Sequence, residues 1–198
     1  MKALRGYILK LIRDAQGRLR VGDSEPNVSY MFCDCKLLKD LNIDNFNTNK
    51  VKKMYHMFEN CSSLEKLNLS NFKTDEVLNM NSMFCGGASL TELKISNFNT
   101  KNVSYMCSMF KECKSLTQIN LSNFNTDKVV DMSFMFKGCS SLKEINLYNF
   151  NINHPTTDIS NMFENCESLN KIIVSKDRLE KFKSISWDNI SNDKFFCE

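Results

Sequence analysis

Apolar residues return along this chain at an interval of 26 residues. An adjacent Met-Phe pair marks each return, and the pairs begin at Met31, Met57, Met83, Met109, Met135 and Met162, with one extra residue before the last pair. When the first residue of each pair is position 1, Leu occupies position 8 and aliphatic residues occupy positions 11 and 13 in all six units. This agreement over 28–174 predicts a stacked repeat array, in which each unit buries its apolar face against its neighbours.

Each unit is predicted to contain a short strand and a short return segment. The Leu-x-x-Leu-x-Leu segment at 64–69 ends in alternation, which is typical of a strand with one face inward. In 77–84 apolar residues fall at every third position, which favours an α-helical or 3-10 return segment with Thr74 as its N-cap. Between the two, Asn71 is expected to bond its own backbone at the corner, and Phe72 to stack on the equivalent Phe residues.

The two ends of the chain do not repeat. Residues 1–27 are predicted to form an N-terminal amphipathic capping helix and a linker, 28–174 the six repeats, and 175–198 a C-terminal cap. A basic amphipathic helix could also lie on a membrane surface. Charged residues interrupt the apolar face of the first 16 residues, so no signal peptide is evident there.

Composition narrows the classes of function. The 198 residues carry 26 basic and 23 acidic side chains, and a net charge of +3 gives no strong attraction to nucleic acid. No apolar run approaches the length of a membrane span, and we expect no membrane contact. The chain has no glycine-rich phosphate loop, and its two histidines, His56 and His154, lie almost four repeats apart. We therefore expect no enzyme.

Nine cysteines invite a disulfide or metal hypothesis. Most of them fall in one column, position 5, at three-residue spacing from Met and Leu, which favours packing in the core. A row of thiols could bind a soft metal, but zinc sites need ligands paired at local spacing, and Cys33-Asp34-Cys35 occurs once. We expect no metal, no cofactor and no disulfide framework.

The fullest units, 57–80 and 109–132, contain Met-Phe-x-x-Cys-x-Ser-Leu-x-x-Leu-x-Leu-Ser-Asn-Phe-x-Thr-x-x-Val-x-x-Met in nearly every position. This string resembles the BspA-type leucine-rich-repeat surface proteins. The resemblance implies an α/β repeat solenoid: a leucine-rich-repeat arc with one parallel sheet of about six short strands, helical or 3-10 return segments and helical caps at both ends. It also implies a location on a microbial surface, or secretion, and adhesion to host matrix proteins or to other microbes.

The outward strand positions 10, 12 and 14 are the candidate binding surface. They are polar, nearly neutral and rich in amides and hydroxyls, which suits a protein or glycan partner held by hydrogen bonds. Tyr148, with Ile173 near it, would be the amphipathic anchor. The candidate partner-binding residues are Asn42, Asn68, Lys94, Gln118, Asn120, Glu144, Asn146, Tyr148 and Ile173. The opposing interpretation is that this surface is merely solvated.

The sequence thus predicts a monomeric, non-enzymatic binding module, of the microbial cell-surface adhesin type, that recognises a host or microbial protein or glycan. The alternative is an intracellular structural or scaffold repeat protein with no adhesive role. No signal peptide or anchor is evident in the chain, so both locations stay open.

Overall fold

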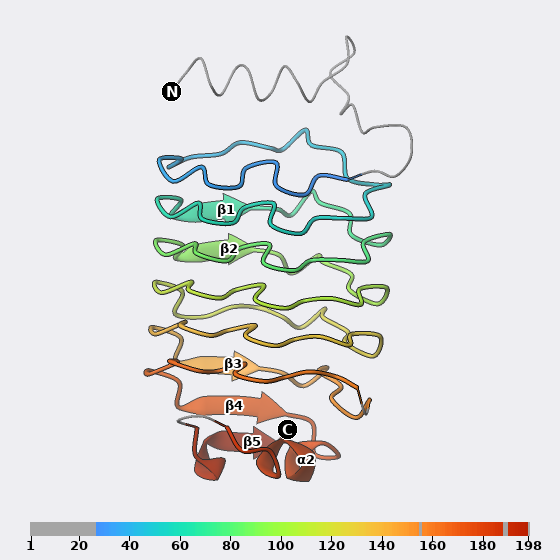
Figure 1. The fold of residues 1–198 in the computed structure, drawn as a ribbon, viewed down its shortest axis with the longest axis vertical. Coiled ribbons are helices and arrows are strands. Elements are labelled where there is room, and N and C mark those ends of the chain that lie inside the picture. Colours follow the sequence, from blue (N-terminus) through green and yellow to red (C-terminus); the bar gives the residue numbers. More distant parts are fainter. Residues whose placement is uncertain (1–26, 155, 188–189, 198) are drawn as a thin grey trace.

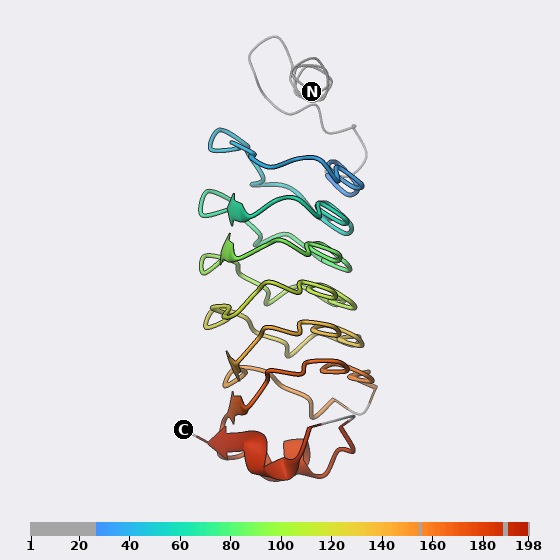
Figure 2. The same cartoon turned by 90° about the vertical axis from the view of Figure 1, so that its left-hand side faces the viewer.

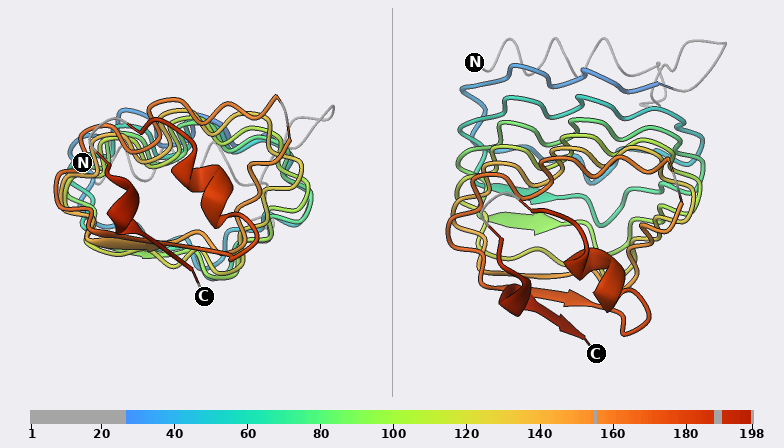
Figure 3. Two further views of the ribbon diagram at one scale, coloured as in Figure 1. Left: turned by 90° about the horizontal axis from the view of Figure 1, so that it is seen from below. Right: turned by 60° about the horizontal axis from the view of Figure 1, so that its bottom comes forward.

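The computed structural model describes residues 27–154, 156–187 and 190–197. In these residues the chain winds through coils that stack along one long axis (Figures 1 and 2). Viewed along that axis, the coils superpose on one flattened outline, with the strands on one long side (Figure 3). The expected N-terminal capping helix falls on residues 1–26, outside the described part of the chain.

The strands form two small parallel sheets instead of the expected single sheet. The strands are β1 (Lys66–Asn68) and β2 (Glu92–Lys94) in one sheet, and β3 (Glu144–Asn146), β4 (Lys171–Val174) and β5 (Phe195–Cys197) in the other, in that order. Lys66 pairs with Glu92 and Glu144 with Lys171, which is the register that the 26-residue period predicts. Strands are missing in the first and fourth repeats, at 40–42 and 118–120.

The return segments are turns, so the expectation of helical returns was wrong. Met57 N–H bonds the Met54 carbonyl within its own coil at 3.3 Å, whereas Phe58 N–H bonds the Met83 carbonyl of the next coil at 2.9 Å. This alternation repeats along the stack and needs a positive φ at two positions of each turn, such as 56° at His56. Successive i→i−3 turns place apolar residues at every third position, as a helix would.

Hydrogen bonds between coils also run along the return side. A continuous series of parallel bridges joins Asn27, Lys53, Asn79, Tyr105, Asp131 and Asp158. Backbone pairing therefore sets the spacing of the coils on both sides of the stack. The return segments that the structure describes are turns and not bulky helices, so nothing in them widens the return side. The stack is close to straight in Figures 1 and 2, whereas the resemblance implied an arc.

Two Phe columns fill the interior. The rings of the Met-Phe column stack from Phe32 to Phe163 with centroids 5.3–5.8 Å apart. In the corner column, Phe46 stacks on Phe72 and Phe124 on Phe150. Fully burying each such ring contributes about 1.5–3 kcal/mol, as does each buried Met, Leu or Ile packed around the columns.

The corner side chains Asn71 and Thr74 bond the neighbouring coil and not their own backbone. Asn71 Nδ2 donates to the carbonyls of Ile43 at 2.9 Å and Phe46 at 3.2 Å. Thr74 is buried, and its Oγ1 donates to the Asn99 carbonyl and accepts from the Asn99 N–H. The expected Asn turn and Thr N-cap were therefore both wrong, because carbonyls of the adjacent coil lie within reach and no helix starts there.

The C-terminal residues close the lower end of the stack with mixed structure. Helix α2 (Leu179–Lys183) and the 3-10 helix η1 (Asn192–Lys194) precede β5. Phe182 of α2 is buried, and Trp187 packs between it and Phe163, the last ring of the Met-Phe column. The end of the stack is thus covered by aromatic packing and one added strand, with only a five-residue α-helix.

Candidate functional site: the strand face

The outward side chains of 40–44, 66–70, 92–96, 118–122, 144–148 and 171–175 form one surface, here called the strand face. Alternation along the strands creates it: in both β1 and β3 the middle residue is buried and its two neighbours are exposed. All nine predicted binding residues belong to these segments. The strand face is therefore the surface that the alternation predicts.

Two hollows open on the strand face. The larger, about 370 Å³, lies over 118–120 and is bounded by 91–93, 144–146 and Ile173. The second, about 350 Å³, lies over 40–42 and 66–68, with Glu92 and Lys94 at its margin. Eight of the nine predicted residues line the two hollows. The second hollow is lined by Asn42, Asn68 and Lys94. The larger hollow is lined by Gln118, Asn120, Glu144, Asn146 and Ile173. Tyr148 lines neither.

The hollows lie where the expected strands are missing. No backbone–backbone hydrogen bond of Gln118, Ile119 or Asn120 is present among the described residues. Beside this gap Leu93 and Ile119 are only half-buried, whereas Ile145 of β3 is 1% exposed. The larger hollow therefore has an apolar floor that a continuous sheet would have closed.

The Asn side chains on this surface have a fixed orientation. The Oδ1 atoms of Asn68, Asn120 and Asn146 each accept the backbone N–H two residues later, at 2.9–3.0 Å. Such Asx turns hold the side chain against its own backbone. The Nδ2 groups have no partner among the described residues, so they present oriented donors to solvent.

Two glutamates of the strand face form ion pairs with lysines of the same surface. Lys66 and Lys94 lie 3.5 Å and 3.2 Å from the Glu92 carboxylate, and Lys171 lies 3.8 Å from Glu144. The hydrogen bond from Lys94 lowers the pKa of the Glu92 carboxyl, and the Lys66 charge acts in the same direction. The Glu92 and Glu144 carboxylates of this surface therefore each lie beside at least one lysine.

The predicted aromatic anchor differs from the structure in one respect. Tyr148 is 46% exposed, but Ile173 is only 8% exposed and offers little surface to a partner. Ile173 pairs with Phe196 of β5, which is 47% exposed and was missed in the sequence because residues 175–198 lie outside the repeat. Any aromatic contact of this end thus involves Tyr148 and Phe196.

The cysteine column serves the core. The thiols of Cys61, Cys113, Cys139 and Cys166 are buried and donate to the carbonyl of the Phe in the preceding coil, at 3.0–3.2 Å. Burial raises the pKa of the Cys61, Cys113 and Cys166 thiols to about 12. All nine cysteines are free, and Cys197 is exposed. The thiols of this column therefore supply hydrogen-bond donors to backbone carbonyls in the interior.

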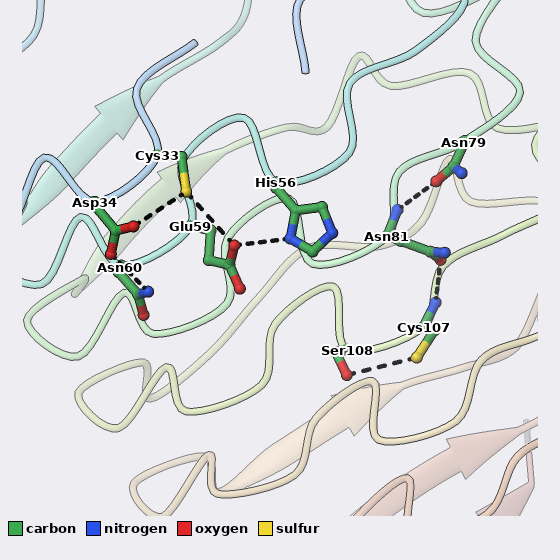
Figure 4. Close-up of polar contacts among 9 residues, drawn as sticks. All are labelled: Cys33, Asp34, His56, Glu59, Asn60, Asn79, Asn81, Cys107 and Ser108. Atoms are coloured by element: carbon green, nitrogen blue, oxygen red, sulfur yellow. Dashed lines mark hydrogen bonds and ion pairs between the residues drawn. The ribbon is translucent and has the colours of Figure 1, made fainter. Parts of the chain in front are cut away.

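A polar cluster on the return side brings together residues that the sequence analysis did not connect (Figure 4). His56 Nδ1 lies 2.8 Å from Glu59 Oε2, and the Cys33 thiol lies 3.6 Å from the same oxygen. Burial, and then the charges of Asp34 and Glu59, raise the pKa of the Cys33 thiol to about 11. The thiol keeps its proton at neutral pH, which disfavours it as a nucleophile.

A second cluster in Figure 4 has a structural explanation. The Asn79 Oδ1 atom accepts the Asn81 N–H, and the Asn81 Oδ1 atom accepts the Cys107 N–H at 2.8 Å. The first bond fixes Asn81 within its own coil, and the second ties two successive coils together. No group of three or more His, Cys, Asp or Glu side chains in the described part of the chain is arranged to hold a metal ion. Among the same residues, no helix has the length and apolar character that crossing a bilayer requires.

The chain matches a protein family described as Mycoplasma protein of unknown function, DUF285. The family matches residues 26–120 and again residues 91–188, and the two matches overlap, as a repeat array permits. Neither a curated protein nor a solved structure matches the chain.

Proposed function

The chain belongs to the DUF285 family, and we propose that it is a non-enzymatic recognition module that binds a macromolecular partner through its strand face. The observation that carries this proposal is the coincidence of the two hollows with eight of the nine outward residues selected from the repeat pattern. Concave surfaces with a few oriented polar groups are the usual form of a binding site. The Cys33 thiol, whose pKa is raised to about 11, keeps its proton at neutral pH, which supports a role without a cysteine nucleophile.

The finer form of the proposal is an adhesin of the BspA leucine-rich-repeat type on a microbial surface, with a host or microbial protein or glycan as partner. The repeat string of 28–174 supports it. Protease treatment of intact source cells tests the location, with a cytosolic protein as control. Loss of this chain while the control survives would agree with a surface location. Survival of both until lysis would rule out the adhesin form.

Binding to the strand face is tested with a matrix glycoprotein, immobilised laminin, and matched variants. Tyr148→Ala and Asn120→Ala, alone or together, are expected to weaken binding, because both side chains are exposed on the strand face. Tyr105→Ala is the matched control, since Tyr105 is 45% exposed on the return side against 46% for Tyr148. Equal loss in all variants would contradict a strand-face site.

One observation favours a second candidate function. All nine cysteines are free thiols, and unpaired cysteines are usual in reducing compartments. An intracellular scaffold protein is therefore the alternative. It is distinguished by the protease experiment, followed by pull-down of intracellular partners if the chain survives.

A further inference from the structure

We propose that the larger hollow of the strand face binds a neutral glycan. This inference rests on the proposed recognition function and specifies the chemistry of the partner. It concerns the hollow over 118–120, which has about 370 Å³, a volume within the range of small-ligand sites.

The floor of this hollow is apolar. Leu93 and Ile119 are half-buried there, because the missing strand leaves the edge of β2 uncovered. The ring carbons of a pyranose carry C–H groups on one face, and such a face can cover an apolar floor of this size. A ligand composed only of charged or polar groups would leave this floor exposed to water.

The rim of the hollow supplies donors and acceptors in the combination that hydroxyl groups need. Asn120 and Asn146 present Nδ2 donors whose orientation is fixed, because each Oδ1 is occupied by a backbone N–H. Glu92 and Glu144 supply carboxylate acceptors, and Gln118 supplies both kinds of group. A sugar hydroxyl donates and accepts at once, so neighbouring hydroxyls can engage an amide and a carboxylate together.

The charge balance favours a neutral ligand. The lining holds two carboxylates, those of Glu92 and Glu144, and lysines that lie 3.2–3.8 Å from them offset their charge. A polyanionic chain would meet Glu92 and Glu144 in the lining, and a polycation would compete with the three lysines that already neighbour these carboxylates, Lys66, Lys94 and Lys171. Neutral hydroxyls meet neither penalty.

The composition of the larger hollow differs from that of a typical protein–protein interface. Protein interfaces are enriched in aromatic residues, Met and Arg, and depleted in Lys, Glu and Ser. The margin of the larger hollow has no aromatic residue, no Met and no Arg among the described residues, and it is made of amides, carboxylates and aliphatic groups. Tyr148 lies outside it.

Affinity electrophoresis tests the proposal with defined probes. The folded protein is run in native gels that contain dextran, yeast mannan, galactomannan or hydroxyethyl cellulose, and in a gel with the polyanion hyaluronan. We expect at least one neutral polysaccharide to slow the protein, and hyaluronan to leave its mobility unchanged. No retardation by any neutral polysaccharide, or retardation by hyaluronan alone, would overturn the inference.

Matched Asn variants locate the site. Asn120→Leu removes a rim donor and is expected to weaken retardation about fivefold, the effect of one lost hydrogen bond. Asn47→Leu is the control, since Asn47 is exposed at a corner outside both hollows and accepts the Asn49 N–H in the same kind of turn. Glu144→Gln, on a side chain that is 62% exposed, is a second variant that leaves folding intact and is also expected to weaken retardation. Equal retardation of Asn120→Leu and Asn47→Leu would contradict the site.

The laminin experiment separates failure of this inference from failure of the proposed function. Enzymatic removal of the glycans from laminin is expected to abolish binding. Binding that survives deglycosylation but is weakened by Tyr148→Ala would leave the recognition function in place and overturn the glycan. Binding that no strand-face variant weakens would refute both.

Discussion

Gly87→Cys is expected to stabilise the protein. Gly87 occupies the column where Cys61 and Cys113 each donate a thiol to a Phe carbonyl of the preceding coil. A cavity of about 10 Å³ lies beside it, bounded by Phe58, Cys61, Leu64, Leu67, Phe84 and Leu90. A thiol at position 87 would fill this space and would donate to the Phe58 carbonyl by the same geometry.

The magnitude follows from three contributions. Restricting the glycine backbone in the unfolded chain contributes about 0.7 kcal/mol, burying a methylene-sized group about 0.8 kcal/mol, and a thiol hydrogen bond about 0.5 kcal/mol. A Cβ at Gly87 would lie 3.1 Å from the Phe84 carbonyl oxygen, which is a tight contact. The same turn accommodates a Cβ at Cys113, where the N–H to Phe110 carbonyl distance is 3.2 Å against 3.1 Å at Gly87. We therefore expect a gain of about 2 kcal/mol, or about 6 °C in Tm.

Urea unfolding, followed by circular dichroism and by the fluorescence of the single tryptophan, Trp187, measures this gain. A reducing agent is needed, because the new Cβ would lie 3.6 Å from Cys113 Sγ. Gly87→Ala is the matched control, since it restricts the backbone without supplying a thiol. Equal stability of the two variants would refute the role of the thiol, and destabilisation by both would show that the turn in the third repeat cannot accept a side chain.

Three further outcomes are expected from urea unfolding of single variants. Phe124→Ala should lower the free energy of unfolding by about 3–5 kcal/mol, because the Phe124 ring is buried against Phe150. Tyr148→Ala should change it by less than about 0.5 kcal/mol, because Tyr148 is exposed. Equal losses in the two variants would place Tyr148 in the core. Thr100→Val should lower the free energy of unfolding by about 2 kcal/mol. It removes the hydroxyl that accepts the Asn125 N–H at 2.7 Å and donates to the Asn125 carbonyl at 2.8 Å. An unchanged stability would show that water replaces the hydroxyl. Burial raises the pKa of Cys113 from 9.0 to about 12, so the folded state keeps a proton that the unfolded state loses. Its contribution to stability is complete below pH 9 and falls above it by about 1.4 kcal/mol per pH unit. Cys113→Ala should flatten the slope of stability between pH 9 and 10.5 by that amount, and an unchanged slope would contradict the burial of the thiol.

The sequence by itself predicted the features that follow from the pattern within one repeat and from the constant length of the repeats. The inward and outward alternation of 64–69 and the constant 26-residue period together require Lys66 to lie beside Glu92, and the structure has this pairing. The period also places Cys113 and Phe124 in columns of the interior, because identical units that stack must superpose equivalent side chains.

Tertiary structure decided the features that depend on hydrogen bonds between coils. Apolar residues at every third position fit a helix and a series of i→i−3 turns equally well, and only the bonds from residues such as Phe58 to the next coil select the turns. Those bonds also hold non-glycine residues such as His56 at positive φ, which a scan for glycine does not find.

The candidate site shows the same division. Repeat alternation alone identified the side chains of the strand face, Asn120 and Glu144 among them. It also predicted a strand at 118–120 that is absent, and the larger hollow lies over that gap. A one-dimensional pattern determines which side of the chain a residue faces, because facing depends on local geometry. Whether two neighbouring segments pair or leave a hollow depends on their separation in space, which the tertiary structure alone decides.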